Sequence, residues 1–170
     1  IASTQKIKTT SNPFKNFKFP PGSPFEDMFE EFNRPTEREA TSLGSGFIID
    51  KKGIVVTNNH VIQGAEEIVV SVNGSTEYKA KVIGTDPYMD LAILQIESKE
   101  EFIPVDFGDS DKARVGDWVI AIGNPFGFGG TVTSGIISSR NRDIGLTRYD
   151  DFIQTDASIN QGNSGGPLFD

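Results

Sequence analysis

Short apolar runs separated by turn residues fill the sequence from Leu43 onward, and no long amphipathic helix lies between them. The runs are residues 46–49, 54–57, 68–72, 78–83, 91–96, 118–122 and 131–138. Runs of this length, bounded by Gly, Asn, Asp and Pro, are typical of β-strands, and Asn73-Gly74 is a strong hairpin signal. A βαβ fold would place helices between the strands. The sequence therefore predicts an all-β fold, an antiparallel sandwich or barrel.

The composition narrows the possible partners. The chain has 170 residues and a net charge of −8, which argues against nucleic acid and anionic membrane surfaces as main partners. It has no cysteine, which excludes disulfides and thiolate chemistry. No apolar run approaches the roughly 18 residues of a membrane span. The chain opens on Ile1 without an initiator Met or a signal peptide, as expected of a piece of a longer protein.

Residues 8–41 differ from the rest because they hold five of the nine prolines together with several Phe, Lys and Glu. We expect a long loop there with a short amphipathic helix. Ser23, Pro24 and Glu26 form a capping pattern, and an apolar stripe of Phe and Met follows over residues 25–32. Docking on its own domain or partial disorder is the plainer interpretation of this stripe. Contact with another subunit or with substrate is the alternative.

The segment 162–168, Gly-Asn-Ser-Gly-Gly-Pro-Leu, is the strongest chemical signal. A nucleophilic serine needs an exposed hydroxyl and backbone N–H groups aimed at the oxyanion that its attack creates. Glycines beside Ser164 allow a sharp turn and leave room for an incoming peptide. The N–H groups of Gly162 and Ser164 are the natural pair for this oxyanion hole, and the predicted hole includes Asn163 between them. A surface turn is the alternative for this segment.

The serine needs a base, and the only histidine is His60, where the run 54–57 ends. The base in turn needs a carboxylate that sets its tautomer and stabilises the imidazolium. Asp90 leads directly into the apolar run 91–96, which predicts a partly dry position beneath the imidazole. Asp86 is the rival, but it precedes a proline and is better explained by turn chemistry. We therefore predict His60, Asp90 and Ser164 as a catalytic triad.

Other binding sites receive little support from the sequence. The glycine-rich segment 123–130 lacks the Lys-Ser/Thr pair of a phosphate-binding loop and is better explained as a turn. One histidine and no cysteine make a zinc site improbable. Calcium on scattered carboxylates stays open, although the EF-hand pattern is missing. We predict no cofactor and no metal.

The order His60, Asp90, Ser164 along the chain is that of chymotrypsin-like proteases and differs from subtilisins and α/β-hydrolases. The chain further resembles the HtrA/Deg family of serine endopeptidases over almost its whole length. The matching segments are residues 44–49, 57–62, 86–94, 123–127, 133–138 and 154–168.

The resemblance implies a chymotrypsin-like double β-barrel over 1–170, with the first barrel ending near residue 105 and the second starting near 115. It implies an ATP-independent endopeptidase of the bacterial periplasm that cleaves unfolded or misfolded proteins, after small or β-branched aliphatic residues. By the same resemblance, residues 8–41 are a loop of the first barrel that supports a homotrimer or larger oligomer, and residues 140–151 are a regulatory loop.

We expect further strands after Asp170 to complete the second barrel, and the family's PDZ domains are absent from this chain. The activity is therefore expected of the parent protein, and this fragment is not expected to be fully active or stable by itself. Two further readings stay open, a chaperone-like interaction module without turnover and a β-rich binding domain unrelated to proteases. Reaction with a fluorophosphonate separates the first from an enzyme, and a large distance between His60 and Ser164 would favour the second.

Overall fold

The computed structural model describes residues 1–9, 36–72, 74, 76–124, 130–145, 148–160 and 162–170, with side chains from 1–5 and from Thr41 onward. Its strands are β1 (Ala2–Thr9), β2 (Thr36–Leu43), β3 (Phe47–Asp50), β4 (Ile54–Asn58), β5 (Glu67–Val72), β6 (Thr76–Asp86), β7 (Leu91–Ile96), β8 (Trp118–Gly123), β9 (Thr131–Arg142), β10 (Phe152–Thr155) and β11 (Leu168–Phe169). The described helices are α2 (Asn59–Ile62) and the 3-10 turn η1 (Ser110–Lys112). The predicted all-β class is confirmed.

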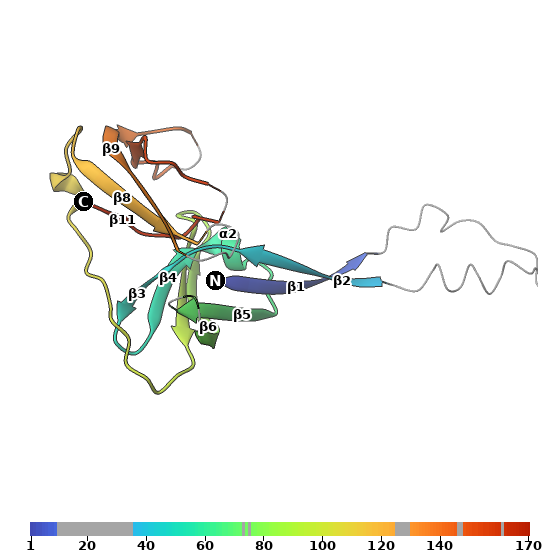
Figure 1. Cartoon of the computed structure of the whole chain (residues 1–170). Coiled ribbons are helices and arrows are strands. Elements are labelled where there is room, and N and C mark those ends of the chain that lie inside the picture. Colours follow the sequence, from blue (N-terminus) through green and yellow to red (C-terminus); the bar gives the residue numbers. More distant parts are fainter. Residues whose placement is uncertain (10–35, 73, 75, 125–129, 146–147, 161) are drawn as a thin grey trace, which may run out of the picture.

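The strands form two antiparallel sheets. One has seven strands in the order β2-β1-β5-β6-β7-β4-β3, and the other has four in the order β10-β9-β8-β11. Figure 1 shows the two sheets joined by the extended segment that contains η1. The second sheet forms only part of a barrel, as the sequence predicted.

The main core belongs to the first sheet. In β7 the residues Ala92, Leu94 and Ile96 are buried and alternate with more exposed ones, which is the period-two pattern of a strand with one face on a core. These residues pack with Val55 of β4 and Val70 of β5 in one cluster. A smaller group in the second sheet includes Val119 and Ile137. The core therefore includes residues of β4, which ends before His60, and of β7, which begins after Asp90.

The ends of the predicted loop 8–41 are corrected by the structure. Residues Lys8–Thr9 belong to β1 and Thr36–Thr41 to β2, and the two strands pair in register from Ala2↔Leu43 to Thr9↔Thr36. They form a ribbon that extends away from the rest of the molecule (Figure 1). The ribbon forms through pairing between its two strands. Its sequence is rich in Thr, Lys and Glu and shows little alternation of apolar residues, so the strands were not predicted. The expected helix over residues 23–32 lies outside the described residues.

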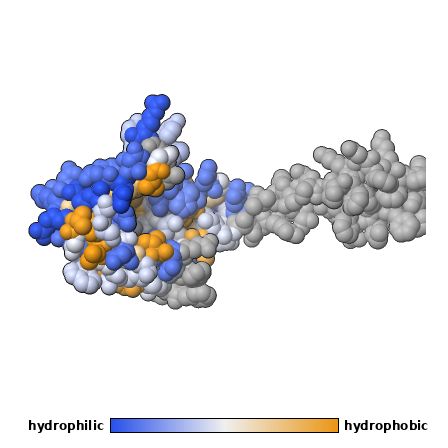
Figure 2. All heavy atoms as spheres, turned by 90° about the horizontal axis from the view of Figure 1, so that it is seen from above, coloured by the Kyte–Doolittle hydropathy of each residue, from blue (hydrophilic) through white to orange (hydrophobic). Residues whose placement is uncertain are grey.

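The hairpin signal at residues 73–74 is confirmed, because β5 and β6 pair antiparallel on either side of it. The surface is mixed, with several separate apolar patches among hydrophilic residues in Figure 2. Large exposed apolar side chains include Trp118 (72% exposed) on β8 and Val132 (62%) on β9. No described helix is long and apolar enough to cross a membrane.

Candidate active site

Asp90 binds His60 at two points. The ring Nδ1 of His60 lies 2.6 Å from Asp90 Oδ2, and the backbone N–H of His60 donates to Asp90 Oδ1 at 2.8 Å. His60 follows β4 as the second residue of α2, whose buried Val61 and Ile62 anchor the turn in the core. With Nδ1 facing the carboxylate, the neutral ring carries its proton there and leaves Nε2 as the acceptor.

The backbone of Asp90 is also held in place. Its carbonyl accepts from Asn59 N–H at 3.0 Å and from the Asn58 side-chain amide at 2.8 Å. Its φ of +51° lies in the left-handed region, which Asp adopts more readily than most residues. The turn before it is closed by Asp86, whose Oδ1 accepts from Tyr88 N–H and Met89 N–H. Asp86 therefore acts in the turn, as its place before a proline predicted.

The side chains of His60 and Asp90 are 53% and 43% exposed, so Asp90 is half-buried. This agrees with the partly dry position predicted for Asp90 from the apolar run after it. Asp90 lies in the turn before β7, and full burial starts at Ala92.

The turn that carries Ser164 packs against the end of β4. The Ser164 carbonyl accepts from Ser45 N–H at 2.7 Å. Gly165 has φ +84°, and a Cβ built there would lie 2.4 Å from both the Ser45 carbonyl oxygen and Thr57 Oγ1. It would also lie 2.9 Å from the amide nitrogen of Asn58. Only glycine fits this position, and its close approach places Ser164 beside the strand that leads into His60.

The space around Gly44 also shows that Ser164 lies close to the turn that carries His60. A Cβ built on Gly44 would lie 3.2 Å from the Ser164 carbonyl oxygen and 2.6 Å from Val61 Cγ2. Ser164 and the residue after His60 therefore flank the same small residue. Among the described residues, no hydrogen bond joins the Ser164 hydroxyl to the His60 ring.

Of the three backbone N–H groups predicted to form the oxyanion hole, one is already hydrogen-bonded within its own turn. The N–H of Asn163 donates to the Asn160 carbonyl at 3.0 Å, so Asn163 is removed from the predicted set. The N–H groups of Gly162 and Ser164 have no acceptor among the described residues. Asn163 is held instead against Gly123, where a Cβ would meet its Oδ1 at 2.2 Å. Gly162 and Ser164 are left as the candidate pair of donors.

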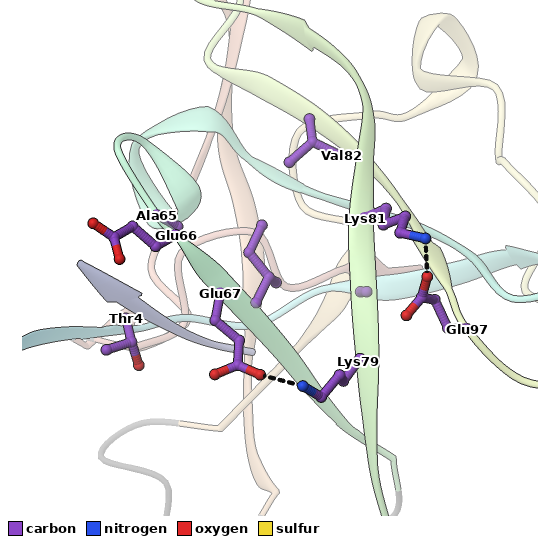
Figure 3. A pocket seen from close by; sticks show the side chains of 10 residues that line it. Thr4, Ala65, Glu66, Glu67, Lys79, Lys81, Val82 and Glu97 are labelled. Atoms are coloured by element: carbon purple, nitrogen blue, oxygen red, sulfur yellow. Dashed lines mark ion pairs between the residues drawn. The ribbon is translucent and has the colours of Figure 1, made fainter. Parts of the chain in front are cut away.

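A depression of about 800 Å³ lies elsewhere, along β5 and β6 of the first sheet (Figure 3). Its lining residues are Thr4, Ala65, Glu66, Glu67, Ile68, Lys79, Ala80, Lys81, Val82 and Glu97. Its two lysines are each paired, Lys79 with Glu67 at 2.7 Å and Lys81 with Glu97. The hydrogen bond from Lys79 and its positive charge lower the pKa of Glu67. The hydrogen bond to Glu67 and its negative charge raise the pKa of Lys79. No candidate catalytic residue lines it.

The fold and this site define a class of protein. A family model described as "Trypsin-like peptidase domain" matches residues 44–170, and the chain belongs to that family. This excludes the reading of a β-rich binding domain unrelated to proteases.

The curated relatives and solved structures narrow the class to the HtrA/Deg type. The chain is 51% identical over 164 residues to "Probable periplasmic serine endoprotease DegP-like" of Bartonella henselae, with 90% of this chain and 33% of the relative covered. It is 55% identical over 154 residues to the protein of the same name from Rickettsia prowazekii, covering 84% and 30%. The structure "HtrA-type protease AlgW with decapeptide" matches with a TM-score of 0.75, at 43% identity, over 99% of this chain and 50% of that chain.

These findings confirm the family resemblance and the chymotrypsin-like fold. The chain spans about a third of the length of the curated relatives it matches. Ser45 and Thr57 lie outside the site predicted from the sequence. Both are buried between the two halves of the site, and the Thr57 hydroxyl donates to the Ser45 carbonyl. The signal for Thr57 was present, because it is a polar residue inside an otherwise apolar strand.

Proposed function

We propose that this chain carries the catalytic centre of an ATP-independent serine endopeptidase that cleaves unfolded or misfolded polypeptides. The observation that carries the proposal is the two-point binding of His60 by Asp90, with the Ser164 turn packed on the strand that ends beside His60. The names of the curated relatives, serine endoproteases, support the same reaction.

In the proposed mechanism, Ser164 Oγ attacks the carbonyl carbon of the scissile peptide and its proton passes to His60 Nε2. Asp90 keeps the other ring proton on Nδ1 and stabilises the imidazolium. The N–H groups of Gly162 and Ser164 donate to the oxyanion of the tetrahedral intermediate. When the C–N bond breaks, His60 returns the proton to the leaving amine and leaves an acyl ester on Ser164. Water, deprotonated by His60, then hydrolyses that ester and restores the serine.

Location and assembly are part of the proposal. The curated relatives are named periplasmic, which supports a periplasmic location for this protein. A homotrimer or larger oligomer formed through residues 8–41 is supported by the ribbon of β1 and β2, which carries both ends of that segment away from the other strands (Figure 1). Replacement of residues 10–35 by a short Gly-Ser linker should lower the molar mass measured by light scattering to that of a monomer.

The experiment that tests the enzymatic proposal is covalent labelling of the intact protein by a fluorophosphonate, followed by peptide mapping. Labelling at Ser164, lost in Ser164→Ala and kept in Ser158→Ala, is the expected result. Ser158 is an exposed serine in the same segment, so it controls for non-specific reaction. Absence of labelling together with absence of hydrolysis of an unfolded protein would contradict the proposal and favour an interaction module without turnover.

A further inference from the structure

Ser45 connects the two halves of the candidate site through four hydrogen bonds, each 2.7 Å long. Its hydroxyl donates to the Gly162 carbonyl and accepts from the Asn124 N–H. Its backbone N–H donates to the Ser164 carbonyl, and its own carbonyl accepts from the Thr57 hydroxyl. Ser45 lies in the connection between β2 and β3 and is 5% exposed. A serine outside the triad thus binds the nucleophile turn on both sides of Asn163 and holds the strand before His60.

The hydroxyl of Ser45 acts on the least constrained residue of the turn. Gly162 has φ +99° and no side chain, so hydrogen bonds must set its orientation. Its carbonyl belongs to the peptide that joins it to Asn163, and the N–H of that peptide donates to Asn160. Ser45 and Asn160 therefore fix this peptide plane from opposite ends. Its orientation governs where the candidate oxyanion donors of Gly162 and Ser164 point.

The residues packed around Ser45 leave little room for another group to replace its hydroxyl. The turn continues through Gly166, whose N–H donates to the Asn163 carbonyl at 2.8 Å. A Cβ built on Gly166 would lie 3.3 Å from Ser45 Cβ. A buried hydroxyl removed here would leave the Gly162 carbonyl and the Asn124 N–H without this partner in a closely packed place. The turn would then reorient toward another acceptor or donor.

We propose that Ser45 is a positioning residue for the acyl-transfer reaction: its hydroxyl orients the Gly162–Asn163 peptide and thereby the oxyanion donors and the Ser164 hydroxyl. The role rests on the proposed function. It acts in the transition state, because the oxyanion forms only there, so its loss lowers kcat and leaves KM nearly unchanged.

The test compares Ser45→Ala with Ser3→Ala in the intact protein. Ser3 is 4% exposed, and its hydroxyl donates to the Val61 carbonyl at 2.6 Å without touching the Ser164 turn. The two variants therefore remove equally buried hydroxyls bound to backbone carbonyls. The measurements are the second-order rate of fluorophosphonate labelling, kcat and KM on a peptide substrate, and the thermal unfolding midpoint.

We expect Ser45→Ala to lower the labelling rate and kcat about 10- to 100-fold, with KM and the midpoint of the pH profile of kcat/KM unchanged. Ser3→Ala should keep both rates within about threefold while lowering the unfolding midpoint. If Ser45→Ala does not fold, Ser45→Cys, which has a similar size but a weaker donor, should show the same selective loss in kcat.

Equal losses in the Ser45 and Ser3 variants, or a loss in Ser45→Cys that follows the unfolding midpoint, would overturn the positioning role. The two proposals fail separately. Unmodified protein that labels and cleaves, with Ser45→Ala and Ser45→Cys equally active, refutes only the role of Ser45. Unmodified protein that neither labels nor cleaves refutes the proposed function itself.

Discussion

Each carboxylate oxygen of Asp90 binds a different group of His60, one the ring Nδ1 and the other the backbone N–H. The second bond ties the carboxylate to the same residue whose ring it orients. Movement of the loop before β7 therefore carries the histidine backbone with it. This coupling makes the tautomer and the position of the ring depend on one side chain.

The Asp90→Asn substitution tests that dependence. The Asn side chain has one acceptor oxygen and an NH₂ group that only donates, so it cannot accept from both the backbone N–H and the ring of His60. It also carries no charge to stabilise the imidazolium, so kcat should fall by about 10³- to 10⁴-fold. Asp86→Asn is the matched control, because an Asn side chain still accepts from the Tyr88 and Met89 amides of the turn. It should keep activity within about fivefold. Comparable losses in both variants, measured by peptide hydrolysis, would remove Asp90 from the triad.

Gly165→Ala tests the docking of the nucleophile turn. Alanine is strained at φ +84°, and its Cβ would meet the Ser45 carbonyl and the Thr57 hydroxyl. We expect loss of labelling at Ser164 and a loss of at least about 2 kcal/mol in the free energy of unfolding.

Gly74→Ala separates strain from contact in the same experiment. Gly74 has φ +72°, but a Cβ there has no neighbour within 4 Å. Gly74→Ala should lower the free energy of unfolding by only about 1 kcal/mol and leave the labelling of Ser164 unchanged. If urea unfolding shows equal losses in the free energy of unfolding for Gly165→Ala and Gly74→Ala, the close packing around Gly165 does not contribute to stability.

The Thr57→Val substitution probes the hydroxyl buried in β4. Thr57 is 1% exposed, and its hydroxyl donates to the Ser45 carbonyl at 2.7 Å. Valine keeps the branched shape but leaves that carbonyl without this donor, so we expect a destabilisation of about 1–3 kcal/mol by denaturant unfolding. Thr155→Val is a control, since the Thr155 hydroxyl donates to the Ile136 carbonyl and accepts from the Ala157 N–H, without a bond to Ser45. It should leave the labelling rate of Ser164 unchanged.

Leu94→Ala tests the core beneath the site. Leu94 is fully buried in β7, whereas Leu91 at the start of the strand is 40% exposed. We expect a loss of about 2–5 kcal/mol for Leu94→Ala, and much less for Leu91→Ala, in equilibrium unfolding. Equal effects would contradict the alternating burial of this strand.

The pair of Arg114 and Asp117 gives a prediction for pH. Hydrogen bonds from the Arg114 side chain and backbone N–H lower the pKa of Asp117. A carboxyl whose folded pKa is depressed stabilises the fold above its unfolded pKa, and that contribution is lost as the pH falls through the folded pKa. Arg114→Gln should raise the NMR titration midpoint of Asp117 toward its ordinary value. Lys112→Gln, which removes the partner of Asp109, should leave it unchanged.

The strand series and the chemical roles proposed for His60, Asp90 and Ser164 could be predicted from the amino-acid sequence alone. Short apolar runs bounded by turn residues are local, so β4, β7 and β8 could be placed from the chain alone, and β7 and β8 show the period-two burial of such strands. The family resemblance was equally local, because its motifs are contiguous segments.

Other features depend on which distant segments meet in the folded chain. The ribbon of β1 and β2 depends on pairing between strands that are distant in sequence, and its residues carry little apolar alternation to announce it. The use of the Asn163 N–H within its own turn follows from chain geometry. The four bonds of Ser45 join segments from Thr57 to Ser164. Such contacts have no signature in one stretch of sequence, because each partner is chosen by where folding brings it.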